Sequence, residues 1–206
     1  MRNPTPFSRR KLLTHTLAGA GAMPLLSVPG LASALAPRAP TPGTFSIPSP
    51  LPTGDIHDFD FFVGTWKSVN RRLKKRWVGS DEWDVFPNTV RCESRMGGVV
   101  NLDEVVFPTK GWSGMTVRTF DLEKRQWSLY WINSRQGVLF PPVVGGFKGD
   151  HGEFYGDDTD EGRPIKVVFK WTRKGPDLAH WEQAFSLDGR TWETNWFVEH
   201  TRVKGG

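Results

Sequence analysis

Two side chains able to transfer protons, His180 and Glu182, stand two residues apart in the stretch LAHWEQA. On a β-strand, residues i and i+2 share one face and lie about 6 to 7 Å apart. If that face is turned inward, an imidazole and a carboxylate meet in one cavity, as general acid/base chemistry or metal binding requires. In the alternative phase, Trp181, Gln183 and Phe185 face inward and the other two side chains lie in water, which is the usual place of His and Glu.

A second group of polar side chains lies in apolar or aromatic stretches such as VRTF and LYWIN. A polar group that faces a core needs a partner. A buried pair of Glu104 and Arg118 would compensate both charges and anchor a ligand, whereas outward cross-strand pairing is the alternative. The expected ligand-binding residues are Arg118, Trp131, Asn133, Tyr130 and Trp181, and the proton-transfer groups of an enzyme would be His180, Glu182 and Glu104.

Metal and thiol chemistry has little support in the spacing of the residues. The scattered His and Glu residues match no zinc pattern, so we expect no metal and no cofactor. A haem or metal carrier is a further alternative, in which His200 or His180 would be the axial ligand. The single Cys92 cannot form an internal disulfide, and its alternating context favours a small buried hydrophobe.

The elements that must position these residues are predicted to be strands. From Asp55 onward, short runs rich in Val, Phe, Trp and Thr alternate with turn residues at intervals of about ten. The predicted strands cover 65–77, 80–86, 89–95, 99–107, 113–121, 126–133, 137–147, 152–156, 164–173, 178–187 and 191–203, with a short helical turn over 58–63. Because nearly every connection is short and open edges are costly, we predict a single antiparallel up-and-down β-barrel of about 8–10 strands.

The N-terminal part of the chain has a different composition. Residues 1–36 combine the basic start SRRKLL, a short apolar run and a small-residue end at Ala36, which is typical of an export signal and resembles the twin-arginine type. Residues 37–54 contain six prolines and are predicted to form an extended linker before a domain over 55–206. We therefore expect a periplasmic or secreted protein.

The string HDFDFFVGTW at 57–66, the later Glu104 and Trp127, and the string FSLDGRTW at 185–192 resemble bacterial lipocalin-like domains of unknown function in the calycin superfamily. The resemblance covers about residues 57–203. In calycins the Trp of Gly-x-Trp lies at the closed end of the barrel, and a basic residue of the last strand lies across its ring. The resemblance thus implies that Gly64 lets the backbone bend tightly and that Arg202 covers Trp66.

The resemblance also implies a cavity for a small molecule, and it brings no catalytic residues with it. We expect an apolar or aromatic ligand; the alternative is a cavity enzyme that performs acid/base isomerisation, hydration, cyclisation or lyase chemistry. Four of the 27 basic residues and none of the 22 acidic residues lie in 1–36, so the remainder carries a net charge of about +1 and has no nucleic-acid footprint. The apolar run before Ala36 is too short and too interrupted by prolines for a membrane span.

Overall fold

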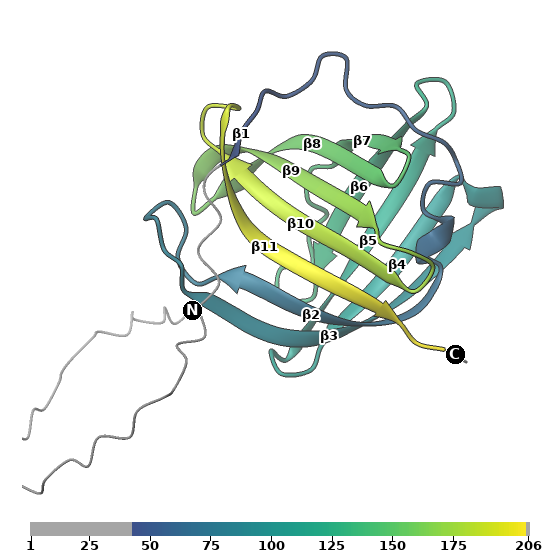
Figure 1. The fold of residues 1–206 in the computed structure, drawn as a ribbon, viewed down its shortest axis with the longest axis horizontal. Helices are drawn as coiled ribbons and strands as arrows, with labels where there is room; N and C mark the ends of the chain where they lie inside the picture. The colour runs from purple at the N-terminus through teal and green to yellow at the C-terminus, as the bar shows by residue number, and fades with distance from the viewer. Residues whose placement is uncertain (1–42, 205–206) are drawn as a thin grey trace, which may run out of the picture. The chain divides into compact units, whose positions relative to one another are not determined.

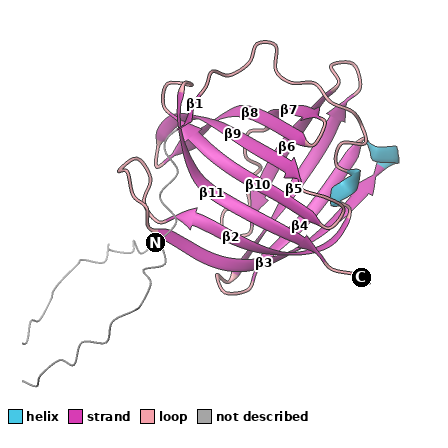
Figure 2. Ribbon diagram, viewed as in Figure 1, coloured by secondary structure: helices cyan, strands magenta, loops and turns pink. Residues whose placement is uncertain are grey.

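Ten antiparallel strands close on themselves in the computed structural model, which describes residues 43–204 (Figures 1 and 2). The strands are β2 (Gly64–Leu73), β3 (Trp83–Arg95), β4 (Val100–Phe107), β5 (Trp112–Asp121), β6 (Gln126–Asn133), β7 (Val143–Lys148), β8 (His151–Asp160), β9 (Arg163–Arg173), β10 (Leu178–Ser186) and β11 (Thr191–Arg202). Each strand pairs with the next, and β11 returns to β2 in a register that runs from Trp196 opposite Arg72 to Arg202 opposite Trp66. The predicted up-and-down barrel is confirmed.

Strand β3 replaces two predicted strands, 80–86 and 89–95. Pro87 lies within this strand, but pairing with β4 begins only at Thr89, so the proline lies where β3 has β2 as its one ladder neighbour. A missing N–H is tolerated at such a position. The predicted helical turn is the short 3-10 helix η1 (Asp60–Phe62), and a second one, η2 (Met96–Gly98), connects β3 to β4.

Residues 43–54 pack along the barrel instead of forming a free tether. The short strand β1 (Gly43–Thr44) pairs with β11, and the Phe45 ring stacks on Trp192 with centroids 4.9 Å apart. Farther on, the Gly54 N–H donates to the carbonyl of Arg125 at 2.8 Å. This segment covers an apolar outer patch made of Tyr155, Val168, Ala184 and Trp192 as it runs from β1 to η1 (Figure 1).

The predicted export signal over 1–36 and the first part of the linker lie outside the described residues. Among residues 43–204, no helix has the length and apolar character needed to cross a bilayer.

One end of the barrel is sealed by η1 and the start of β2. Gly64 adopts a φ of 118°, a conformation that favours glycine, and the chain there turns directly into the barrel wall. The Arg202 guanidinium lies 4.2 Å from the Trp66 ring centre and donates to the carbonyls of Val63, at 2.7 Å, and Phe61. The resemblance implied this contact, which closes the end where η1 lies and leaves the loops at the other end to surround an opening.

Candidate functional site

A cavity of about 120 Å³ lies inside the barrel between η1 and the open end. Seven of its eighteen lining residues are aromatic, one from η1 and the others from strands β4, β6, β9, β10 and β11: Phe62, Phe107, Trp131, Phe169, Trp171, Trp181 and Trp196. Polar side chains cluster among them: Asn70, Asn88, Asp103, Thr116, Arg118, Gln183 and His200. The cavity therefore combines an apolar wall with a few polar groups, which is the usual composition of a small-molecule site.

Strand β10 has the phase that turns Trp181 and Gln183 inward, so His180 and Glu182 lie on its outer face. There the His180 Nδ1 is 2.7 Å from a carboxylate oxygen of Glu199, and its Nε2 is 3.6 Å from Glu182. The neighbouring carboxylate of Glu182, and then that of Glu199, raises the pKa of His180 against the opposing effect of burial. His180 and Glu182 thus form an ion-pair cluster with Glu199 on the outer wall and do not reach the cavity. The interpretation in which His180 and Glu182 face inward is therefore wrong.

Arg118 faces the cavity, but its partner is Asp103 and not the expected Glu104. Asp103 and Arg118 are only 3% and 2% exposed, and one guanidinium nitrogen of Arg118 donates to the Asp103 carboxylate. The other terminal nitrogen donates to the side-chain oxygen of Asn101 at 2.7 Å. Glu104 has the opposite phase on β4 and is exposed, so the expected pair was displaced by one residue.

Aromatic rings hold the Arg118 guanidinium in place. Its carbon lies 4.7 Å from the ring centre of Phe59, 5.6 Å from that of Phe62 and 5.8 Å from that of Trp171. Cation–π contacts of this kind stabilise a desolvated cation. Arg118 therefore contacts both the aromatic rings at the sealed end of the barrel and the polar part of the cavity.

His200 is a buried cavity residue that the sequence singled out only as a possible haem ligand. Its Nδ1 is 2.8 Å from the hydroxyl oxygen of Ser68, and its ring stacks on Trp171 at 5.4 Å with an interplanar angle of 13°. Burial, with the charge of Arg118, lowers the pKa of His200 to about 3. The imidazole is thus neutral at pH 7, and Nε2 is the nitrogen left to hydrogen bond with a ligand. So weak a base is poorly matched to proton abstraction near neutral pH.

Three buried polar atoms in the cavity wall have no hydrogen-bond partner among residues 43–204. They are Nε of Arg118, Nε1 of Trp171 and the side-chain oxygen of Asn88. Buried polar atoms in proteins nearly always have a partner. Two of these atoms are donors and one is an acceptor.

The remaining expected ligand-binding residues divide between three places. Trp131 and Trp181 line the cavity, and the Trp131 indole packs on Gly114, where any side chain would overlap it. Tyr130 has the outward phase on β6. Asn133 lies beyond the cavity, where its side-chain oxygen accepts from backbone N–H groups in the turn that follows β6.

A larger hollow of about 370 Å³ at the open end shares Leu129, Trp131, Phe169, Gln183 and Trp196 with the inner cavity. We call it the vestibule. Its other lining residues are Arg72, Trp112, Asn133, Arg135, Gln136, Phe140, Pro141, Val143, Asp158, Thr159, Asp160, Val167 and Phe185. Its volume falls in the range of typical ligand pockets, and it forms a polar entrance to the aromatic cavity.

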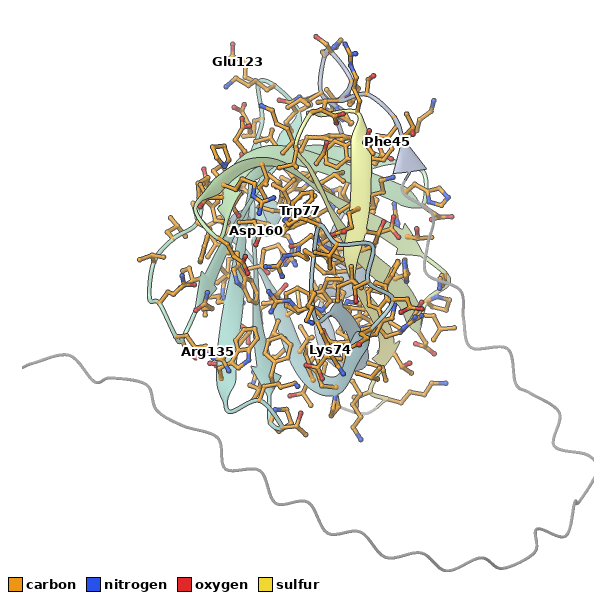
Figure 3. All side chains as sticks on the ribbon, turned by 90° about the vertical axis from the view of Figure 1, so that its left-hand side faces the viewer. Phe45, Lys74, Trp77, Glu123, Arg135 and Asp160 are labelled. Carbon is orange, nitrogen blue, oxygen red and sulfur yellow. The ribbon has the colours of Figure 1, made fainter. Side chains whose placement is uncertain are left out.

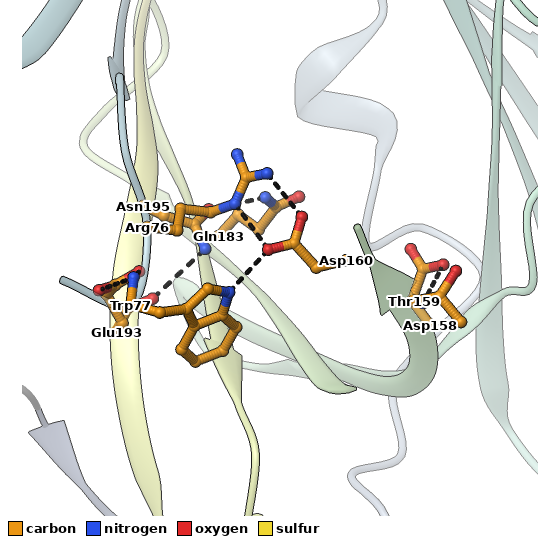
Figure 4. A network of polar contacts seen from close by, with 8 residues as sticks. All are labelled: Arg76, Trp77, Asp158, Thr159, Asp160, Gln183, Glu193 and Asn195. Carbon is orange, nitrogen blue, oxygen red and sulfur yellow. Dashed lines mark hydrogen bonds and ion pairs between the residues drawn. The ribbon is translucent and has the colours of Figure 1, made fainter. Parts of the chain in front are cut away.

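The loop between β2 and β3 reaches across this entrance. Arg76 binds Asp160 through two hydrogen bonds of 2.9 and 2.5 Å, and the Trp77 indole N–H donates to the same carboxylate at 2.7 Å (Figure 4). The backbone N–H of Trp77 donates to Glu193 at 2.9 Å. Burial would raise the pKa of Asp160, but the hydrogen bonds from Arg76 and Trp77 outweigh it and lower that pKa. In Figure 3, Trp77 and Asp160 lie near the middle of the face shown and Arg135 lies nearer its edge.

The part of the chain that the structure describes contains no cluster of side chains suited to bind a metal ion. No three or more His, Cys, Asp or Glu side chains gather there in a way that could hold an ion. Cys92 is buried, its thiol donates to Asn101 at 3.3 Å, and burial raises its pKa to about 11. The thiol is therefore protonated at neutral pH and is a poor nucleophile.

Comparison with known proteins gives structural similarities at low sequence identity. No protein-family model and no curated protein matches this chain. One similar structure is that of a DUF3598-family protein of unknown function from Nostoc punctiforme PCC 73102, which is 12% identical in sequence with a TM-score of 0.43. The match covers 74% of this chain and 50% of the other, so this chain spans about half the length of that protein. The S-type phycobiliprotein lyase CPES from Guillardia theta is 13% identical with a TM-score of 0.46, over 72% of this chain and 92% of the other.

Proposed function

We propose that this protein binds a small, apolar and largely aromatic molecule inside the barrel. The observation that carries the proposal is a cavity walled by seven aromatic rings, in which three buried polar atoms lack a protein partner. Aromatic side chains gain from stacked or edge-on contact with a ring beyond the area they bury. A flat apolar ligand would make such contacts with the aromatic wall of the cavity.

The inner end of the ligand is proposed to be uncharged. Arg118 is neutralised by Asp103, and His200 is neutral because burial lowers its pKa. The polar part of the cavity therefore offers hydrogen bonds without a net charge, which suits a hydroxyl, carbonyl or amide group. An isolated ionised group there would lose its hydration without gaining an opposite charge.

Binding is favoured over acid/base catalysis by the positions of the proton-transfer groups. His180, Glu182 and Glu104 lie on the outer face, where none of them can reach a molecule in the cavity. Within the cavity, the histidine is a weak base and the aspartate is engaged by an arginine. A ligand held there would meet hydrogen-bonding groups and no evident general base.

We further propose that the protein acts outside the cytoplasm, on the grounds of residues 1–36 alone. The basic start, apolar run and small-residue end support export. Fractionation of the producing cells followed by N-terminal sequencing tests this part separately. A mature start near residue 37 in the exported fraction is expected, and an intact N-terminus in the cytoplasm would contradict it.

Titration with the neutral fluorescent probe N-phenyl-1-naphthylamine tests the binding function. We expect saturable one-to-one binding to the wild type. Val105→Phe narrows the cavity and should weaken binding by about tenfold or more, because Val105 is 8% exposed and lines the wall. The matched control is Val106→Phe, which changes the neighbouring residue, 41% exposed on the outer face, and should leave binding unchanged. Equal affinity in all three proteins would overturn the proposal.

A further inference from the structure

Arg72 is a half-buried cation without a partner. It has the inward phase on β2, and its guanidinium lies 4.5 Å from the ring centre of Trp196, in the wall of the vestibule. Within residues 43–204 its side chain makes no ion pair and no hydrogen bond. Asp84, which faces it in the β2–β3 register, is bound by Lys110 at 2.6 Å. Burial, followed by the charge of Arg76, lowers the pKa of Arg72.

Arg135 lines the same vestibule from the loop after β6. Its guanidinium lies 5.2 Å from the ring centre of Trp112, and one nitrogen donates to the backbone carbonyl of Lys110 at 3.2 Å. No carboxylate of the described chain pairs with it. The two arginines thus place a pair of planar cations around one hollow, each held against an indole ring and neither in direct contact with a carboxylate of residues 43–204.

The carboxylates of the vestibule do not balance these charges. Asp160 is occupied by Arg76 and Trp77. The backbone N–H of Thr159 donates to the Asp158 carboxylate, and burial raises the pKa of Asp158. Among the lining residues, Arg72 and Arg135 are therefore matched by the single carboxylate of Asp158, and one positive charge remains even when Asp158 is ionised. The charge of Arg72 is the one partly screened from water, since Arg135 is exposed.

We propose that the vestibule binds an anionic group, such as a carboxylate or a sulfonate, on the outer end of the ligand. Arg72 and Arg135 would donate charge-assisted hydrogen bonds to it, for which planar guanidinium groups are well suited. The inference rests on the proposed binding function and specifies how the ligand is oriented in the site. The ligand class is an amphipathic aromatic acid whose uncharged end enters first and whose anion stays at the entrance.

Two probes that differ by a single anionic group test this inference. 8-Anilinonaphthalene-1-sulfonate and N-phenyl-1-naphthylamine share one aromatic skeleton, and the first carries the sulfonate. At neutral pH we expect the wild-type protein to bind the sulfonate tighter than the neutral probe. Arg72→Gln should weaken sulfonate binding by about tenfold or more and leave the neutral probe within about twofold.

Arg71→Gln is the matched control. Arg71 precedes Arg72 on β2, lies on the outer face and also stacks on an indole, 5.1 Å from the ring centre of Trp83. The substitution Arg71→Gln removes the same charge at a residue that does not line the vestibule. It should therefore change the affinity for neither the sulfonate nor the neutral probe. Arg135→Gln, in an exposed loop, gives a second test with little risk to folding, and it should weaken the sulfonate selectively.

The outcomes separate the two proposals. If both probes bind equally and neither Arg72→Gln nor Arg135→Gln alters their ratio, the anion site is refuted while binding in the cavity stands. A loss of sulfonate affinity that is the same in Arg71→Gln would also refute it, because the effect would then follow net charge. If neither probe binds the wild type, the binding function itself fails.

Discussion

Asp103 and Arg118 form an ion pair inside the barrel, on neighbouring strands β4 and β5, with exposures of 3% and 2%. Buried pairs of this kind gain little net stability, but removing one partner leaves the other uncompensated. Here the pair also lies beside the polar part of the cavity. Its charges cancel, which is why we assign an uncharged end of the ligand to this part of the site.

Asp103→Asn is expected to lower the free energy of unfolding by about 3 to 5 kcal/mol, because it leaves the Arg118 charge buried without an opposite charge. Urea unfolding followed by tryptophan fluorescence measures this. Glu104→Gln, at the neighbouring exposed position, should change stability by less than about 0.5 kcal/mol. Equally small effects in both variants would show that Arg118 is not a desolvated charge.

Arg202→Gln is expected to destabilise the barrel by about 1 to 3 kcal/mol, because it removes the cation–π contact with Trp66 and three hydrogen bonds to backbone carbonyls. Affinity for N-phenyl-1-naphthylamine should be retained, since this contact seals the end away from the entrance. Thermal and urea unfolding give the stability. Lys204→Gln, two residues on and 84% exposed, is the control, and an identical effect of both changes would contradict the sealing role.

His200 predicts a loss of stability at mildly acidic pH. Its pKa falls from 6.5 in the unfolded chain to about 3 in the fold. Above pH 6.5 the imidazole is neutral in both states; below it, the unfolded chain takes up a proton that the folded protein excludes, so stability falls until the pH reaches about 3.

Between about pH 7.5 and pH 5, this linkage should cost roughly 2 kcal/mol. The measurement is urea unfolding at both pH values. His200→Gln should show less pH dependence than the wild type, whereas His151→Gln, on the exposed outer surface, should retain it. His180 has a raised pKa and acts in the opposite sense, but it is present in all three proteins. An unchanged slope in His200→Gln would show that His200 is not buried in its neutral form.

The entrance loop predicts an effect on ligand exchange. Asp160→Asn removes the charge that holds Arg76 and weakens the acceptor of the Trp77 indole N–H, so the β2–β3 loop should open more often. We expect both association and dissociation rates of N-phenyl-1-naphthylamine to rise several-fold, with a small change in the equilibrium constant. Stopped-flow fluorescence measures both rates, and unchanged rates would indicate that the loop does not limit entry.

The order of strands and the closure of the barrel could be predicted from the sequence because alternation, turn residues and the Gly-x-Trp start are local signals. The phase of each strand could not. Glu104 and Asp103 are adjacent, and a shift of one residue exchanges the inner and outer faces. Both LAHWEQA phases were plausible, and the one adopted turns Trp181 and Gln183 toward the cavity. A β-bulge between Gln183 and Ala184 further shifts the register with β11.

Contacts between distant segments explain the other differences. Residues 43–54 have the composition of a linker, yet the Phe45 ring stacks on Trp192, 147 residues later in the chain, on the outer wall. Arg71 to Arg76 form a basic run in the sequence, but Arg71 faces outward, Arg72 lines the vestibule and Arg76 binds Asp160. Such different roles within one run depend on the strand phase and on the loop that follows.

The most direct measurement is diffraction from crystals of the complex with 4-bromophenol, an uncharged aromatic probe whose bromine is located by its anomalous scattering. Saturable binding in solution is established first. We predict one anomalous peak inside the barrel, between Trp131 and Trp181, with the hydroxyl within hydrogen-bond distance of the Asn88 side-chain oxygen or the Trp171 indole nitrogen. A bromine found only on the outer surface, with the barrel interior unchanged, would contradict the proposed function.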